Sequence, residues 1–492
     1  MSLALSDVRV ILVGAMLALF LSALDQTIVA PALPPIAADL GGFTLISWVV
    51  TAYLLTSTCA TAVLGKLSDL YGRRRVINGS LVLFMIGSAF AALAPSMPLL
   101  ILARGLQGFG GGGLLTVGQT IIADVVSPRE RGRYAGYFAI VWGSASVLGP
   151  TFGGVLTQYY GWPWIFWINL PCGLAALLIA DRALRKLPVE PRRSRIDLPG
   201  VLWLSLGTVA LLLVLSLGGK TLAWSEPTLL LLAAVALLSG ALFARGQTRA
   251  AEPILPPRFI KDGVIRPVLI VSFVIYAVWM AVSVLAPVYF QVALGASVSR
   301  AGLLMIPLML SSTITANLAG LYTRRRARYK LPPYVSLPVT IVVLVVMAFF
   351  ARHLSTTVAA GLLMIAGFGY GPIFPCCNVA AQNAVQRRDL GAVSGAVAFS
   401  RTLGGAVGVA AASALVLGLL AAALGQGGPM GDIEDLARHA LSPAARQAAA
   451  GAFAVMFGLA GAVLVLALAV YARVEDRELG EHAPAASLSA GE

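Results

Sequence analysis

Long apolar stretches alternate with short polar segments along the whole chain of 492 residues. Each stretch is about 20 residues long, which is the length that an α-helix needs to cross the hydrocarbon of a bilayer. Apolar residues fill each stretch rather than alternating with polar ones, so the pattern is not that of an outer-membrane β-barrel. We therefore predict an all-α membrane protein with fourteen transmembrane helices, at residues 9–31, 44–66, 75–94, 98–122, 133–158, 163–181, 198–217, 228–244, 267–291, 300–321, 333–351, 356–382, 391–424 and 451–472.

The composition agrees with this class of protein. Only 11% of the residues are charged, and the mean hydropathy is +0.88, whereas roughly a quarter of the residues of a soluble domain are charged. Lipid cannot hydrogen-bond a bare backbone, so the spanning segments must satisfy their own amide groups as helices.

The net charge of +14 suggests a nucleic-acid-binding protein until the charges are located. If the N-terminus is inside the cell, most of the 35 Lys and Arg residues fall in cytoplasmic segments. This is the positive-inside bias, so we expect both termini in the cytoplasm and no nucleic-acid partner. The first apolar run has no small-residue cleavage site, so we expect no cleaved signal peptide. The outer loops carry only Lys220, Arg300, Arg352, Arg438 and Arg446.

The cysteine and histidine residues predict neither a metal site nor a disulfide framework. All four cysteines fall inside predicted helices, and no Ser/His/Asp order of an enzyme is present. The glycine run 110–113 lies in the middle of a helix rather than in a phosphate-binding loop. We therefore expect a protein that is not an enzyme and that has no cofactor.

An internal repeat divides the chain into two halves. Residues 106–136 match residues 365–395 at a constant offset, with glycines in the same order, and "LYGRRR" (70–75) matches "LYTRRR" (321–326). Coincidence is the alternative in a chain with 51 glycines, but the shared basic loop and the preserved order favour a repeat. Parallel repeats suit a transporter with its site between the halves. The predicted organisation is a six-helix bundle at 1–186, a linker with two inserted helices at 187–262, a second six-helix bundle at 263–472 and a disordered cytoplasmic tail at 473–492.

Asp25 and Arg104 are charged residues that lie inside predicted helices, where a charge is costly. Asp25 in "LSALDQTIVAPALPP" and Arg104 in "RGLQGFGGGG" each lie roughly 9 Å from the outer end of their helix, at 1.5 Å per residue. Such residues face a cavity or a partner and mark ion or proton pathways. We predict a functional role for the two residues together; a static ion pair between two helices is the alternative.

The loop after the second helix contains the ordered motif "GKLSDLYGRRRV". Gly65 and Gly72 permit close backbone approach, and Asp69 can accept hydrogen bonds at a helix N-terminus. Arg73 can form a two-pronged ion pair with a carboxylate, for which Asp124 is a suitable partner. A plain cluster of positive charges is the alternative, but it does not explain the order of Gly, Asp, Gly and Arg. We predict that these five residues form a gate latch on the cytoplasmic side.

The fifth helix contains "LGPTFGG", which combines a proline with small residues. Pro150 removes a backbone donor and bends the helix, whereas Gly149, Gly153 and Gly154 let another helix approach closely. The counterpart in the second half, "AFSRTLGGAVG", carries Arg401, a second buried cation. We expect Arg401 to line the substrate cavity; a charge without a role in transport is the alternative.

Aromatic and polar residues near the middle of the helices are candidates for the wall of that cavity. A lipid-facing position is the alternative for the aromatic ones. A largely apolar wall with few charges suits bulky lipophilic solutes. With Arg401, the candidates are Tyr53, Gln107, Phe138, Trp142, Tyr276, Trp279 and Phe399.

These motifs, in this order, resemble those of the major facilitator superfamily. "LDQTIVAPALP" together with fourteen spans is similar to its 14-helix drug:proton antiporter family of multidrug exporters. The resemblance covers nearly the whole chain and implies two six-helix bundles that work by alternating access. It implies a proton-binding role for Asp25 with Arg104 as its neighbour, the latch of Asp69, Arg73 and Asp124, and the antiporter bend around Pro150.

The chain departs from the family pattern in two places. Ala30 stands where the first-helix motif often has Asn, and the predicted ninth and tenth helices hold no acid, unlike those of several cation exporters. Transport of divalent cationic drugs is therefore not expected.

The resemblance implies proton-driven export of lipophilic drugs or toxic compounds from the cytoplasm or inner leaflet. The alternative is a dedicated exporter of one metabolite, such as an antibiotic, a siderophore or an amino-acid derivative. A receptor or scaffold without transport would not explain Asp25 and Arg104. The expected partners are a small lipophilic substrate, protons and the lipid bilayer, and we expect a monomer in a bacterial plasma (inner) membrane.

Overall fold

The computed structural model describes the chain except residues 1–4, 42–44, 186–196, 219–221, 223–224, 424–442 and 480–492. Within the described residues, thirteen helices are long and apolar enough to cross a membrane. A fourteenth long helix, α5 (Met97–Val125, 29 residues), occupies the predicted fourth span and carries Arg104 and several glycines. The predicted all-α membrane fold is therefore confirmed.

The helices of the N-terminal half follow the predicted spans, except that the span expected at 163–181 is divided between Trp164–Trp167 and Asn169–Leu184. The chain reverses between the second and third spans at Gly72, whose φ of 87° favours glycine, and it leaves the fifth span at Gly161, whose φ is 90°. Pro128 begins the fifth span, where a missing amide donor does no harm. The elements are α1 (Leu5–Ile28), η1 (Ala30–Ala32), α2 (Leu33–Leu40), α3 (Ile46–Tyr71), α4 (Arg73–Ala92), α5, α6 (Pro128–Tyr160), α7 (Trp164–Trp167) and α8 (Asn169–Leu184).

The C-terminal half differs from the prediction at two breaks. The span expected as a single helix at 300–321 is divided between Val298–Leu303 and Ile306–Arg326. The span expected as a single helix at 356–382 forms two helices, because Pro372 has no backbone N–H and its ring disfavours a continuous helix. The elements are α12 (Ile265–Val292), α13 (Val298–Leu303), α14 (Ile306–Arg326), α15 (Leu331–Phe350), α16 (Thr356–Tyr370), α17 (Ile373–Asn383), η3 (Arg387–Asp389), α18 (Leu390–Ala423) and α20 (Pro443–Ala472), preceded by the short α11 (Pro257–Lys261).

The two halves pack their repeated glycines in the same way. Gly108 lies against the backbone of α3, and its counterpart Gly367 lies against the backbone of α14. Gly110 lies against α4, and its counterpart Gly369 lies against α15. The order of helix contacts is thus the same in both halves, as the sequence repeat predicts, and these glycines serve close packing.

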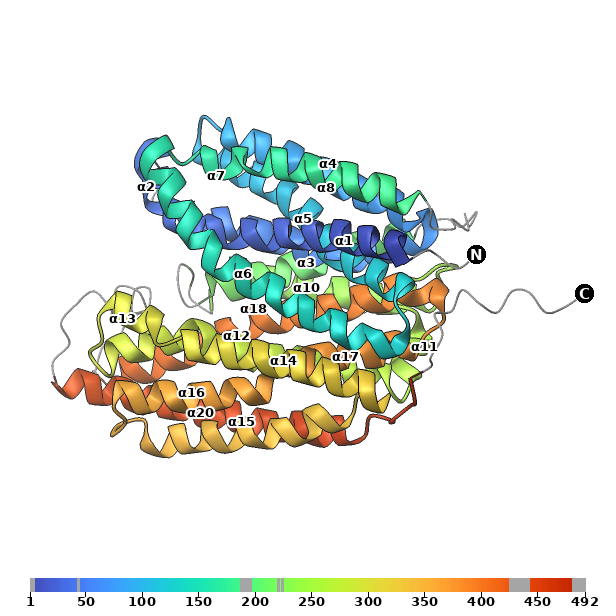
Figure 1. Cartoon of the computed structure of the whole chain (residues 1–492). Helices are drawn as coiled ribbons and strands as arrows, with labels where there is room; N and C mark the ends of the chain where they lie inside the picture. Colours follow the sequence, from blue (N-terminus) through green and yellow to red (C-terminus); the bar gives the residue numbers. More distant parts are fainter. Residues whose placement is uncertain are drawn as a thin grey trace, which may run out of the picture.

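Figure 1 shows the halves as two bundles, one above the other. Contacts between them run mainly through two helix pairs, α3 with α18 and α6 with α14. The start of α1 and the end of α20 lie at the same end of the bundles, which we call the termini side. The other end, which we call the opposite side, carries α2, α7 and α13. The bundles approach each other on the termini side and diverge on the opposite side (Figure 1).

The two inserted helices, α9 (Leu198–Leu217) and α10 (Pro227–Gln247), pack against each other at the outer edge of the bundles. α9 also contacts α3 and α18, so it covers the seam between the halves. The ion pair between Lys66 and Glu252 (2.7 Å) fixes the chain after α10 to α3. The inserted pair therefore lies beside the seam rather than between the two halves.

The first part of the predicted tail, residues 473–479, packs on the turn between α14 and α15. Val474 and Leu479 are buried, and the hydroxyl of Tyr329 donates a hydrogen bond to the backbone oxygen of Glu475 at 2.7 Å. The prediction of disorder is wrong for these residues, because two apolar side chains and the main chain find partners there. The rest of the tail lies outside the described residues.

Candidate functional site

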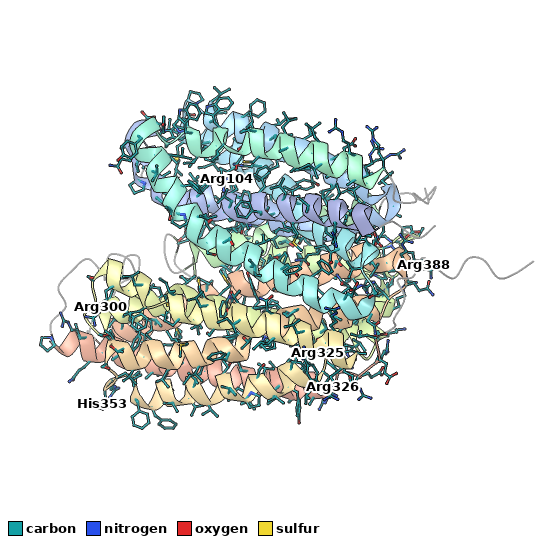
Figure 2. The ribbon with its side chains drawn as sticks, in the orientation of Figure 1. Arg104, Arg300, Arg325, Arg326, His353 and Arg388 are labelled. Atoms are coloured by element: carbon teal, nitrogen blue, oxygen red, sulfur yellow. The ribbon has the colours of Figure 1, made fainter. Side chains whose placement is uncertain are left out.

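Asp25 and Arg104 form an ion pair in the interior of the N-terminal bundle. Nη1 of Arg104 lies 2.7 Å from Oδ2 of Asp25, and the two residues are 0% and 1% exposed. They come from the neighbouring helices α1 and α5, and Figure 2 shows Arg104 inside the upper bundle. The structure thus brings together the two charges that the sequence placed at the same depth.

Three uncharged side chains complete a buried polar cluster around Asp25. Oδ1 of Asp25 accepts hydrogen bonds from Gln107 (2.7 Å) and Asn169 (2.8 Å). Both amides also donate to the hydroxyl of Ser88 at 3.0 Å. A buried charge is tolerated only when it is paired and hydrogen-bonded, so the cluster holds α1, α4, α5 and α8 in one arrangement. The prediction that Gln107 lines the substrate cavity is therefore wrong, because its amide forms hydrogen bonds inside this cluster.

The guanidinium of Arg104 also packs against aromatic rings. It lies 4.4 Å from the ring centre of Tyr53 and 5.6 Å from that of Phe166, and its Nε donates to the backbone oxygen of Val49 at 3.3 Å. The hydroxyl of Tyr53 is within hydrogen-bond distance of Ser22 (3.2 Å). Tyr53 is thus buried inside the N-terminal bundle, and its predicted position in the cavity wall is wrong.

The helix that carries Asp25 is bonded to α6 close to that residue. The hydroxyl of Thr27 donates to the backbone oxygen of Ala145 at 2.8 Å. A Cβ atom at Gly149 or Gly153 would collide with α1, so these glycines allow the close contact that the sequence predicts. Gly154 faces open space instead, because it lies on another side of the helix, and its predicted packing role is wrong.

The five residues of the predicted latch meet on the termini side. Arg73 forms ion pairs with Asp69 (2.5 Å) and Asp124 (2.8 Å). Its Nη1 also donates to the hydroxyl of Ser68 at 2.9 Å. Arg73 begins α4, Asp69 lies near the end of α3 and Asp124 near the end of α5, so the two ion pairs join the ends of these three helices.

The same latch reaches across to the C-terminal half. The carboxylate of Asp69 accepts hydrogen bonds from the backbone amides of Gly391 (2.9 Å) and Ala392 (2.7 Å), at the start of α18. A helix N-terminus carries a partial positive charge, which favours a carboxylate there. A Cβ atom at Gly65 would collide with the backbone oxygen of Gly391, so the two helices touch through their backbones. Arg387 adds an ion pair to Asp124 at 3.6 Å.

A cavity of about 430 Å³ lies between the two halves, and the latch is on its termini side. Of the predicted wall residues, five line it: Phe138, Trp142, Tyr276, Trp279 and Arg401. The break between α16 and α17 also faces it, through Gly371 and Phe374. Phe399 does not line it and packs with Val63 and Leu204 beside the inserted helices instead. The reason is that Phe399 and Arg401 are two residues apart on α18 and so point to different sides.

The cavity is closed on the termini side by a second contact between the halves. Nη1 of Arg131 donates to the backbone oxygen of Gln382 (3.3 Å), and its Nη2 donates to that of Ala123 (2.7 Å). Arg131 and Gln382 both line the cavity. This arrangement joins α6 to α17 at the floor of the cavity.

Comparison with known proteins gives consistent matches. The sequence model of a family described as the Major Facilitator Superfamily matches residues 15–409. An uncharacterized MFS-type transporter of Mycobacterium tuberculosis is 36% identical over 86% of this chain, and the chain spans only 61% of the length of that relative. The multidrug transporter protein MdtP of Bacillus subtilis is 34% identical over 81% of this chain and 73% of its own length.

The fold also matches solved structures. A crystal structure of the human organic anion transporter MFSD10 superimposes with a TM-score of 0.65 and covers 94% of this chain and 99% of its own. The sequence identity of 17% limits this likeness to the fold.

Proposed function

The chain belongs to the major facilitator superfamily, and from this premise we propose that it is a proton-coupled antiporter that exports lipophilic compounds by alternating access. This is a family of membrane transporters and not of enzymes. The observation that carries the proposal is the buried Asp25 in an ion pair with Arg104, next to a helix that lines the central cavity. A carboxylate at such a depth is costly and marks a proton or ion pathway.

The charges at the two ends of the bundles support an orientation in the membrane. Arg325, Arg326 and Arg388 lie on the termini side, whereas Arg300 and His353 lie on the opposite side (Figure 2). The positive-inside rule therefore supports a cytoplasmic termini side. The latch around Arg73 then closes the cytoplasmic side, and the described arrangement is the one in which the cavity is shut off from the cytoplasm.

Proton binding and movement of the bundle are linked through α1. An ionised Asp25 accepts hydrogen bonds from Arg104, Gln107 and Asn169. Protonation removes the charge that holds Arg104, and α1 becomes free to shift against α5. Because Thr27 is bonded to α6, such a shift reaches the helix that carries Phe138 and Trp142 into the cavity.

The wall of the cavity supports a lipophilic substrate. Aromatic side chains of the C-terminal half contact one another there: Tyr276 lies 5.4 Å and Trp279 6.4 Å from Phe374, measured between ring centres. Largely apolar pockets of a few hundred Å³ bind drug-sized molecules. The name of the Bacillus relative, a multidrug transporter, supports drugs or toxic compounds as the substrate class.

Export of one specific metabolite is the second candidate. Nε1 of Trp142 and the hydroxyl of Ser283 line the cavity without a hydrogen-bond partner. Buried polar groups of this kind discriminate strongly against substrates that cannot pair with them. A resistance panel of chemically diverse compounds separates a narrow exporter from a broad one.

The cellular setting is part of the same proposal. We propose a plasma (inner) membrane of a bacterium as the location; the relatives of the chain include bacterial transporters and a fungal efflux pump. A single chain supplies both bundles and the cavity between them, so we propose that the monomer is the functional unit.

The test is substrate-dependent proton movement by the full-length protein in liposomes with a trapped pH indicator. Lipophilic probes of positive, neutral and negative charge are added in turn. The proposal predicts that at least one probe accelerates proton movement across the membrane. Proton movement that no probe changes would contradict an antiporter.

A further inference from the structure

Arg401 is a buried cation in the cavity wall to which no acidic side chain is paired. It is 8% exposed and lines the cavity from α18. Its Nε is buried without a hydrogen-bond partner, and no ion pair involves Arg401 among the described residues. Arg104 is also buried, at 1% exposed, but has Asp25 at 2.7 Å. The two arginines therefore differ in whether a carboxylate compensates the buried charge, and such a partner decides how well a buried charge is tolerated.

Aromatic rings take the place of a carboxylate around Arg401. Its guanidinium lies 5.9 Å from the ring centre of Phe138, 5.6 Å from that of Tyr276 and 5.9 Å from that of Phe374. The rings come from α6, α12 and α17, so both halves contribute to the cage. Cation–π contacts compensate only part of the lost hydration of a charge. The cage therefore orients the guanidinium and leaves its charge available for a ligand.

The other described residues that line the cavity provide further hydrogen-bond donors and no acidic side chain. Trp142 can act only as a donor through Nε1, and this atom is unpartnered, as is the hydroxyl of Ser283. Arg131 places a second cation at the floor. Among the described lining residues there is no Asp or Glu. The wall thus combines positive charge with unused hydrogen-bond donors, which is complementary to an acceptor with negative charge.

We propose that Arg401 is the anion-binding subsite of the cavity and that the substrates are drug-sized lipophilic organic anions. A carboxylate or sulfonate group pairs with the guanidinium of Arg401, and the apolar body of the substrate lies among the surrounding rings. This inference rests on the proposed export function and names its substrate class. Lipophilic cations are disfavoured, because a like charge beside Arg401 would be repelled where little water screens it.

Binding to the full-length protein in lipid nanodiscs tests the inference without requiring transport. The probes are three pyrenes with the same butyl chain that end in a sulfonate, an alcohol or a trimethylammonium group. Since Trp142 and Trp279 line the cavity, energy transfer from tryptophan to pyrene reports saturable binding. Wild-type protein is expected to bind the sulfonate at least tenfold more tightly than the trimethylammonium probe.

Substitutions of Arg401 distinguish the effect of its charge on binding from the effect of its shape. Arg401→Gln is expected to weaken sulfonate binding about tenfold or more, the loss typical of one charge-assisted hydrogen bond, and to change alcohol binding less than twofold. Arg401→Lys retains the charge and is expected to retain the preference for the sulfonate, which also shows that the site remains folded. The matched control is Arg300→Gln, which removes an exposed arginine on the opposite side and is expected to change none of the three affinities.

Three results would overturn the inference. They are tighter binding of the trimethylammonium probe than of the sulfonate, an equal loss of affinity for all three probes in Arg401→Gln, and no saturable binding of any probe to the wild type. Failure of the proposed function gives a different result. If the sulfonate binds through Arg401 but a proton gradient does not drive its movement in liposomes, the subsite stands and proton-coupled export is wrong. If the gradient drives the cation and not the sulfonate, export stands and the anion subsite is wrong.

Discussion

Asp25 and Arg104 form a 2.7 Å ion pair that lies outside the central cavity. The carboxylate is fully buried in the N-terminal bundle, whereas the cavity wall begins at α6 and the end of α5. In the proposed mechanism, a coupling proton and a substrate therefore do not compete for one position. Their exchange depends on a movement of helices, for which the hydrogen bond from Thr27 to Ala145 is the most direct connection.

Removal of Arg104 is expected to destabilise the protein strongly. Arg104→Gln leaves Asp25 as an unpaired buried charge, and breaking a buried pair in this way costs about 3–5 kcal/mol. The double variant Asp25→Asn/Arg104→Gln removes both charges and is expected to recover part of the loss. Thermal unfolding in detergent measures both effects.

The matched control for that experiment is Arg74→Gln. Arg74 pairs with Asp181 at 2.8 Å, but the two side chains are 37% and 23% exposed, so the expected cost is only about 0–1 kcal/mol. Equal losses of stability for the variants of Arg104 and Arg74 would contradict the view that the buried pair holds the bundle.

The latch on the termini side is expected to open when Asp69 loses its charge. Asp69→Asn weakens the pair with Arg73 and the contact with the start of α18. A cysteine introduced at the buried Ser394, in a variant without the four native cysteines, is expected to react several-fold faster with a water-soluble maleimide.

Asp262→Asn is the control for the latch, because Asp262 pairs with Arg477 within the C-terminal half on the same side. It is expected to leave the reactivity of the cysteine unchanged. Unchanged reactivity in Asp69→Asn would show that this carboxylate does not keep the two halves together.

Two adjacent glycines of α6 are expected to respond in opposite ways to alanine. A Cβ atom at Gly153 collides with the backbone oxygen of Ile28, whereas a Cβ atom at Gly154 meets no atom. Gly153→Ala is therefore expected to separate α1 from α6 and to reduce transport at least tenfold. Gly154→Ala is expected to keep full transport and to stabilise the helix by up to about 1 kcal/mol. Similar transport by both variants would exclude a role for the close contact between α1 and α6.

Much of the fold was predictable because a bilayer imposes the length and polarity of each helix. The same constraint made Asp25 and Arg104 conspicuous, since a charge within an apolar run is rare. The latch was recognisable because its side chains are charged and ordered around Gly72. Its partner in the other half was not, because the backbone amides of Gly391 and Ala392 leave no signal in the sequence.

The parts that sequence reasoning missed depend on which side of a helix a residue occupies. Tyr53 and Phe399 are aromatic residues at suitable depth, but their helix faces point away from the cavity. Asn169 and Ser88 complete the polar cluster, yet single uncharged polar residues occur in many helices. The break at Pro372 had a signal, since proline interrupts helices, but its effect depended on the packing around it.

The central claim is that Asp25 carries the coupling proton. The most direct measurement compares wild type, Asp25→Asn and the control Asp181→Asn in liposomes under an imposed proton gradient, with transport of the pyrene sulfonate and dissipation of the gradient recorded together. The account predicts that wild type and Asp181→Asn transport the probe and dissipate the proton gradient, whereas Asp25→Asn binds the probe but neither transports it nor dissipates the gradient. Equal gradient-driven transport by Asp25→Asn would contradict the account and reduce Asp25 to a structural role.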